Sequence, residues 1–167
     1  MTKKIILNLA ISLDGYIADD YGGFDWIKGD GDKSHDTKDQ FSFSKFLDSV
    51  EIIIMGRKAY DESYDVSKDM LKSKKVLVAT HRPIENKPDN VEIISGDIIS
   101  KVTEPKENIW LFGGGILIDN FIKADVIDEY IIGVIPIILG SGRPLFLKNN
   151  PRINLHLTEC TVQEGIT

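Results

Sequence analysis

The chain has a single cysteine, no concentration of positive charge and no long apolar stretch. Cys160 alone cannot form an intrachain disulfide, which favours a reducing compartment. The net charge of −6, without a basic run, makes nucleic acid and acidic membranes poor partners. No stretch approaches the ~20 apolar residues of a membrane span. With 42% hydrophobic and 28% charged residues, the composition predicts a cytoplasmic globular protein.

Short apolar runs separated by turn residues predict the strands. Several runs are apolar at every position, as in strands that are covered on both faces. The full set of predicted strands is Ile5–Ile11, Ile52–Met55, Val76–Ala79, Val91–Ile94, Ile109–Phe112, Tyr130–Ile138 and Leu155–Thr161. Apolar residues at helical spacing lie between several of them, in Phe41–Val50, Arg57–Tyr64 and Gly115–Lys123.

This alternation predicts an α/β fold with a mainly parallel sheet and helices on both sides. The length of 167 residues fits one domain over residues 1–167. No helical pattern separates Tyr130–Ile138 from Leu155–Thr161, so we expect antiparallel pairing at that edge. The last residues, 163–167, are typical of a turn that opens into a further strand.

A glycine triplet, Gly113 to Gly115, stands between a predicted strand and a predicted helix. An open helix N-terminus offers unpaired N–H groups and partial positive charge, which suit phosphate oxygens. The spacing is not the dinucleotide fingerprint, because Ile118 stands where its third glycine would be. The triplet therefore predicts either an anion-binding turn or a plain tight turn.

Four predicted strand ends carry small, hydroxyl or basic residues. These segments are Ala10–Ala18, Ile54–Tyr60, Ala79–Pro83 and the glycine triplet. Ligands of open α/β sheets lie beyond the carboxyl ends of the strands. Together the four ends predict one binding site at that edge of the sheet.

The irregular stretch Tyr21–Asp36 is rich in Gly and Asp, and its alternating aspartates are similar to those of a calcium loop. However, His35 and Phe41 stand where such a loop needs glycine and glutamate. We therefore predict no metal site there, but a mobile solvated loop that could act as a lid.

The chain resembles the dihydrofolate reductase superfamily, in particular the bacterial branch related to the reductase domain of riboflavin biosynthesis. The residues that carry the resemblance are Ser12–Ala18, Met55–Tyr60, Phe112–Leu117 and the tail Val126–Phe146. It implies a dihydrofolate reductase-like three-layer sandwich, with a mostly parallel central sheet, an antiparallel C-terminal edge hairpin and flanking helices. It also implies NADPH as the hydride donor, a small heterocyclic or sugar-linked substrate, and pairing into a homodimer.

The resemblance implies roles for particular residues of the cofactor site. Ala10 and Ile17 would frame the nicotinamide; Gly56, Arg57 and Lys58 would hold phosphate; Thr80, His81 and Arg82 would surround the 2′-phosphate; Gly113, Gly114, Gly115 and Ile116 would cradle the pyrophosphate. Ordinary surface ion pairing is the alternative for the two arginines. Asp14 is more typical of a turn cap before Gly15.

The substrate side departs from the pattern of the family. Ala59 replaces a usual threonine, and Phe112 stands where riboflavin reductases carry a substrate-binding glutamate. Phe112 favours a flat ring, which Phe24 and Trp26 could cover. Asp39, on a predicted helix Thr37–Val50, is the candidate proton donor, with Phe43 one turn further along the same face. Asp36 and Asp48 compete for that role, and Asp39 could instead be a helix cap.

The resemblance implies an NADPH-dependent reductase acting on a small molecule, either a ribosylamino-pyrimidine or a pterin. The alternative is an NADP(H)-binding protein of the same fold without turnover. A zinc deaminase is excluded, because its ligands include two cysteines and this chain has one.

Overall fold

The computed structural model describes residues 2–167 and contains a six-stranded sheet in the order β5-β4-β3-β6-β1-β7. All of its neighbouring strands pair in parallel. The strands are β1 (Ile5–Ser12), β3 (Ile52–Gly56), β4 (Lys75–Ala79), β5 (Val91–Ile94), β6 (Ile109–Gly113) and β7 (Glu129–Ile135); β2 (Tyr16–Ala18) and β8 (Arg143–Pro144) form a separate antiparallel pair. The predicted mostly parallel sheet is thereby confirmed.

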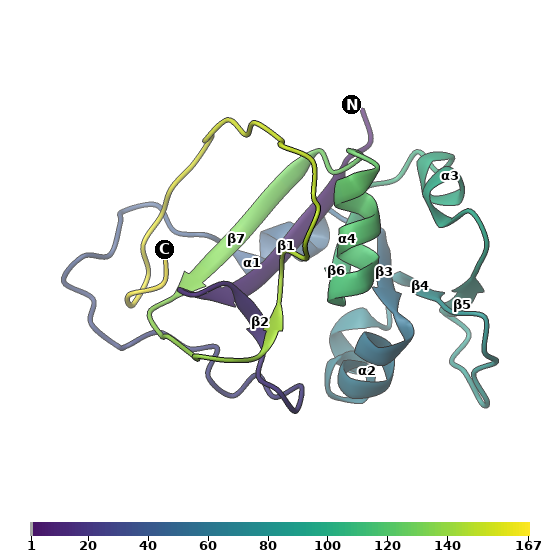
Figure 1. The fold of residues 1–167 in the computed structure, drawn as a ribbon, viewed down its shortest axis with the longest axis horizontal. Helices are drawn as coiled ribbons and strands as arrows, with labels where there is room; N and C mark the ends of the chain where they lie inside the picture. The colour runs from purple at the N-terminus through teal and green to yellow at the C-terminus, as the bar shows by residue number, and fades with distance from the viewer. Residues whose placement is uncertain (1) are drawn as a thin grey trace.

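Helices cover both faces of the sheet (Figure 1). They are α1 (Phe43–Asp48), α2 (Arg57–Leu71), α3 (Ile98–Thr103) and α4 (Gly115–Lys123). One core joins α3 and α4 to one side of the strands, and a second joins α1 and α2 to the other. The apolar runs thus fill both layers, as expected for strands that are covered twice. Within residues 2–167, no helix combines the length and apolar character that crossing a membrane requires.

Two predicted helices have different limits in the structure. The helix expected over Phe41–Val50, or from Thr37, is only α1, because the Ser42 side chain caps it by accepting the N–H of Lys45. Conversely, the helix expected to end at Tyr64 continues to Leu71, whose fully buried side chain extends the apolar spacing. α3 was not predicted, since its six residues are too few to show a period.

The predicted antiparallel edge hairpin is not formed as expected. β7 pairs in parallel with β1, and residues 154–160 are exposed and form no strand. The edge of β7 instead meets the C-terminus, where Val134 and Thr167 exchange both main-chain hydrogen bonds at 2.7 and 3.2 Å. The predicted turn before it is present as a bridge between Gln163 and Ile166.

The loop predicted to resemble a lid is fastened to this C-terminal turn. Asp30 N–H donates to Glu164 O, Thr37 N–H donates to Val162 O, and Glu164 N–H donates to Asp36 Oδ1. Asp30 and Asp32 each accept a nearby main-chain N–H, so their carboxylates form local turns. No group of possible metal ligands is found within residues 2–167.

Candidate functional site

A cleft of about 2060 Å³ opens at the carboxyl ends of β1, β3 and β6 and continues along β7. Eleven predicted site residues line it. They are Ala10, Ile17, Phe24, Gly56, Arg57, Lys58, Phe112, Gly113, Gly114, Gly115 and Ile116. The structure therefore brings three of the four predicted strand ends together around one cleft, and the fourth reaches it through Ala79.

The N-termini of α2 and α4 meet at the centre of this cleft. Their N-cap residues are Gly56 and Gly114, and neither helix start receives a side-chain cap. A Cβ placed on Gly56 would lie 3.7 Å from Gly114 N, so the two glycine turns are in contact. The first N–H groups of both helices thus face one region, where their partial positive charges add.

The glycine turn leaves room for a ligand. A Cβ placed on Gly114 would meet no heavy atom within 4 Å, and a cis peptide bond joins Gly113 to Gly114. Gly113 has a φ of 145°, a backbone conformation that favours glycine. The arrangement suits a pyrophosphate, because it joins open space to unpaired N–H donors.

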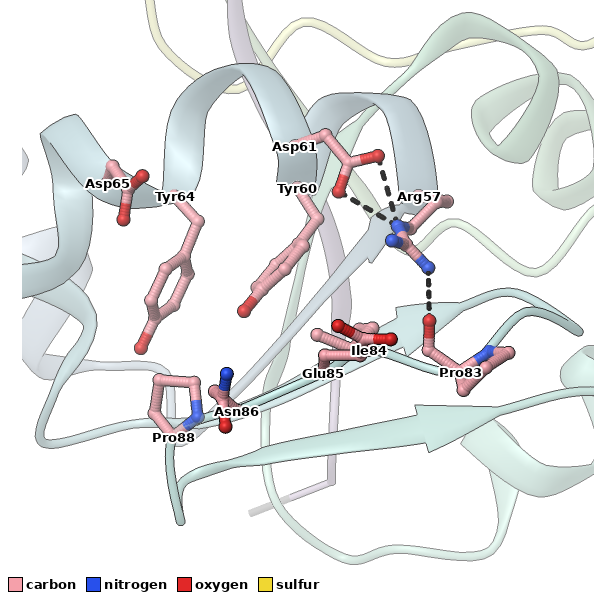
Figure 2. A pocket seen from close by; sticks show the side chains of 10 residues that line it. All are labelled: Arg57, Tyr60, Asp61, Tyr64, Asp65, Pro83, Ile84, Glu85, Asn86 and Pro88. Atoms are coloured by element: carbon pink, nitrogen blue, oxygen red, sulfur yellow. Dashed lines mark hydrogen bonds and ion pairs between the residues drawn. The ribbon is translucent and has the colours of Figure 1, made fainter.

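Arg57 connects α2 to the turn that follows β4 (Figure 2). Its Nε donates to both carboxylate oxygens of Asp61, at 2.8 and 3.0 Å, and its Nη1 donates to Pro83 O at 2.9 Å. Of the two roles predicted as alternatives, the structure shows the ion pair, and phosphate binding stays a prediction. Arg57 fixes the Thr80–Pro83 turn, and Nη2 is not used in these bonds.

The residues expected around the 2′-phosphate do not line the cleft. Thr80 is half-buried, whereas His81 and Arg82 are exposed. The main-chain N–H of Arg82 donates to Thr80 Oγ1 at 3.1 Å, which closes the turn. The turn thus stands beside the cleft with a basic side chain in solvent.

A second hollow, of about 550 Å³, lies between α2 and the segment after β4 (Figure 2). Tyr60 and Tyr64 lie side by side in it, with ring centroids 4.8 Å apart, and three carboxylates surround them. Burial, followed by the charges of its neighbours Tyr64, Asp65 and Asp61, raises the pKa of Tyr60. Because its acidic groups outnumber Arg57, this hollow does not suit a phosphate.

An aromatic wall bounds the cleft on the side of α1. It consists of Phe41, Phe43, Trp110 and Phe112, all of which line the cleft. The ring centroid of Trp110 is 5.7 Å from that of Phe43 and 5.0 Å from that of Phe112. Such a wall suits a flat apolar ring.

Two predicted substrate-side residues lie elsewhere. Trp26 is buried outside the lining of the cleft, and its Nε1 donates to Gly23 O at 3.1 Å, so it stabilises its own loop. Asp39 is exposed, precedes α1 and does not line the cleft. The helix face that Asp39 was expected to share with Phe43 is absent, because α1 begins only at Phe43.

Sequence reasoning missed Asn8 and Trp110 as residues of the cleft. Both lie inside predicted strands and were taken for ordinary strand positions. Asn8 had a signal, since it is the only polar residue of the run Ile5–Ile11. Asp14 proved to be more than a turn cap, because it accepts the N–H groups of Leu139 and Gly140 across the chain.

Comparison with known proteins shows the family of this chain. A family model described as "RibD C-terminal domain" matches residues 60–166. The protein YyaP of Bacillus subtilis is 36% identical over an alignment of 182 residues, gaps included. The match covers 98% of this chain and 92% of YyaP.

Solved structures agree on the fold. A putative riboflavin biosynthesis protein from Shewanella sp. PV-4 has a TM-score of 0.81 and 27% identity, and the match covers 99% of this chain and 95% of that one. A dihydrofolate reductase from Enterococcus faecalis, complexed with NADP(H) and RAB-propyl, has a TM-score of 0.58 and 13% identity, over 88% and 80% of the two chains.

Proposed function

We propose that this chain, which belongs to the RibD C-terminal domain family, is an NADPH-dependent reductase that transfers hydride to a small flat heterocycle. The observation that carries the proposal is the contact between two uncapped helix N-termini at an open glycine turn. The fold neighbour complexed with NADP(H) supports the choice of cofactor.

The cofactor half of the cleft comprises Gly56–Lys58 and Gly113–Ile116, and the Thr80–Arg82 turn stands beside it. Main-chain N–H groups of α2 and α4 would hold the pyrophosphate, and the Lys58 ammonium would add charge. Arg82 would approach the 2′-phosphate from the turn that Arg57 fixes. Ala10 and Ile17 would frame the nicotinamide from β1 and β2.

When it is bound, NADPH supplies the hydride, and the residues of the chain orient the acceptor and exclude water. The aromatic wall would stack against the substrate ring, and Phe24 would cover it from the loop after β2. Phe112 offers no hydrogen bond to a sugar chain, so the proposal favours a bare ring, pterin or pyrimidine, over a ribosylated one.

Two measurements on the purified protein test this function. Fluorescence titration should show that NADPH binds more tightly than NADH, and NADPH absorbance should fall when a pterin or an aminopyrimidine is added. Tight NADPH binding without oxidation against either ring would favour the alternative, a binding protein without turnover. Equal affinities for the two cofactors would contradict the assignment.

We also propose that the protein acts as a homodimer. Residues 154–160 are exposed and take part in no main-chain hydrogen bond within residues 2–167. Leu155 and Leu157, 65% and 78% exposed, give this segment an alternating apolar face. Sedimentation at micromolar concentration should show a dimer that Leu157→Asp weakens, and a wild-type monomer would refute the proposal.

The exposed free thiol of Cys160 is consistent with a cytoplasmic protein.

A further inference from the structure

Asn8 is a buried amide in the middle of β1. Its side chain lies on the same face of the sheet as Ile6, and the residue is only 8% exposed. The main-chain carbonyl of Asn8 accepts the Trp110 Nε1–H at 2.9 Å. Its side-chain Nδ2, however, finds no acceptor within residues 2–167. A buried donor without a partner is costly, so this group needs an explanation.

The surroundings of Asn8 give that explanation, because Asn8 lines the cleft between the aromatic wall and β7. Its neighbours on this face are apolar: Ile6 precedes it, Trp110 and Phe112 lie on β6, and Ile131 is its partner on β7. None of them carries a charge. A ligand beside Asn8 would therefore meet a flat, neutral surface with one amide at its edge.

Resting on the reductase function proposed above, we infer that Asn8 determines substrate specificity by binding the lactam or aminopyrimidine edge of an uncharged ring. A carboxamide offers one acceptor and two donors, which complement a C=O and N–H placed side by side. The ring then stacks on the aromatic wall while its polar edge satisfies the amide. A site with a buried amide rejects rings that lack such an edge, because the amide would stay unpaired.

The first test compares rings of one size that differ at the edge. Pterin, which has a lactam edge, and quinoxaline, which has none, are titrated into wild-type protein saturated with NADP⁺. Pterin should bind at least about tenfold more tightly. A third probe, 5,6-diaminouracil, has the same edge on a single ring. Tighter binding of pterin than of diaminouracil indicates a bicyclic ligand, and the reverse order indicates a single ring. Equal binding of pterin and quinoxaline overturns the inference.

The second test uses Asn8→Leu, with Asn120→Leu as the control. Asn120 also lines the cleft but is exposed on α4. Asn8→Leu should bring pterin and quinoxaline to within about twofold of each other and should raise Tm, because it removes an unpaired buried donor. Asn120→Leu should keep the wild-type preference. A fall in Tm or a failure to fold for Asn8→Leu would show a purely structural amide and overturn the inference.

NADPH titration of the same proteins separates this inference from the proposed function. Loss of the ring preference with unchanged NADPH affinity supports the role of Asn8. If NADPH neither binds nor is oxidised in wild type, the reductase function fails, and the ring titrations repeated without nucleotide still decide whether Asn8 reads the edge. If Asn8→Leu and Asn120→Leu oxidise NADPH with pterin at equal rates, the inference about Asn8 fails while the reductase function stands.

Discussion

The proposed cofactor half of the cleft is formed mainly by main chain, whereas the proposed substrate half is formed by side chains. Gly56 and Gly114 contribute N–H groups of two helix starts, and no side chain separates them. On the other side, Trp110, Phe112 and Phe43 present rings to the cleft, with Asn8 beside them.

The difference matters for what each half can recognise. Main-chain donors bind pyrophosphate whatever the rest of the sequence, so one fold can keep one cofactor. Side chains change singly, and Phe112 makes this part of the wall apolar. A member of this family can therefore change its substrate while its cofactor half is preserved.

Filling the glycine turn should have the largest effect, and it tests the main-chain half. Gly114→Val should lower NADPH and NADH affinity by on the order of 100-fold, because several charge-assisted hydrogen bonds are lost together. The free protein should fold, since a Cβ at this position meets no heavy atom within 4 Å. Fluorescence titration and thermal unfolding measure the two expectations, and Gly114→Ala provides a milder step. If Gly114→Val binds NADPH with wild-type affinity, the pyrophosphate does not bind at this turn.

The division between main chain and side chains also decides how much of each half could be predicted from the sequence. The strands through Ile52–Met55 and Val76–Ala79 were correctly predicted from apolar runs, because burial on both faces leaves a strong local pattern. Val91–Ile94 was also predicted, although at the edge of the sheet only Val91 and Ile94 are buried. The glycine turn was likewise visible as three consecutive residues. Both features depend on neighbours in the sequence.

The substrate half depends on contacts between distant segments, which local spacing cannot show. Thr37 begins the helix predicted from sequence, yet its hydrogen bonds with Val162 hold it outside α1. A Cβ placed on Gly29 would clash with Glu164 O, so this loop and the C-terminal turn are in direct contact. The predictions of a lid and of a catalytic Asp39 were both made without knowledge of that contact.

A smaller effect is expected at the edge of the cofactor half, where a side chain does contribute. Arg82→Ala should narrow the preference for NADPH over NADH by on the order of tenfold, since one charge-assisted contact to the 2′-phosphate is lost. NADH affinity itself should stay nearly unchanged. Arg152→Ala, which removes an exposed charge away from the lining of the cleft, is the control. If both variants narrow the preference equally, overall charge and not Arg82 sets it.

Asp14 joins the end of β1 to the turn at residues 139–140 and should make stability depend on pH. Its carboxylate accepts the Ser12 hydroxyl, Leu139 N–H and Gly140 N–H. The hydrogen bond from Ser12 is the largest of the effects that hold the pKa of Asp14 below its usual value. A pKa that is lower in the folded than in the unfolded state stabilises the protein above about pH 4, and this gain disappears as pH falls through the folded value.

Asp14→Asn should therefore lower Tm at pH 7 and reduce the loss of Tm on acidification below about pH 4. Asp48→Asn changes an exposed carboxylate on α1 and should leave the pH profile of Tm as in wild type. Parallel profiles for wild type and Asp14→Asn would show that the hydrogen bonds of Asp14 add no net stability.

The smallest effect is expected at Asp39, which the structure places outside the lining of the cleft. The side chain is exposed and lies outside the lining of the cleft. Within residues 2–167, the only hydrogen bond of Asp39 is made by its main-chain carbonyl, which accepts the Thr37 hydroxyl at 2.7 Å. A surface substitution of this kind changes free energies by at most about 0.5 kcal/mol, so Asp39→Asn should keep turnover within about twofold of wild type. Asn8→Leu provides the contrast, since it changes a side chain that lines the cleft. Steady-state oxidation of NADPH with pterin compares them. A tenfold fall in turnover for Asp39→Asn, with NADPH affinity intact, would mean that the loop moves to bring this carboxylate to the substrate, and the substrate half would then extend beyond the aromatic wall.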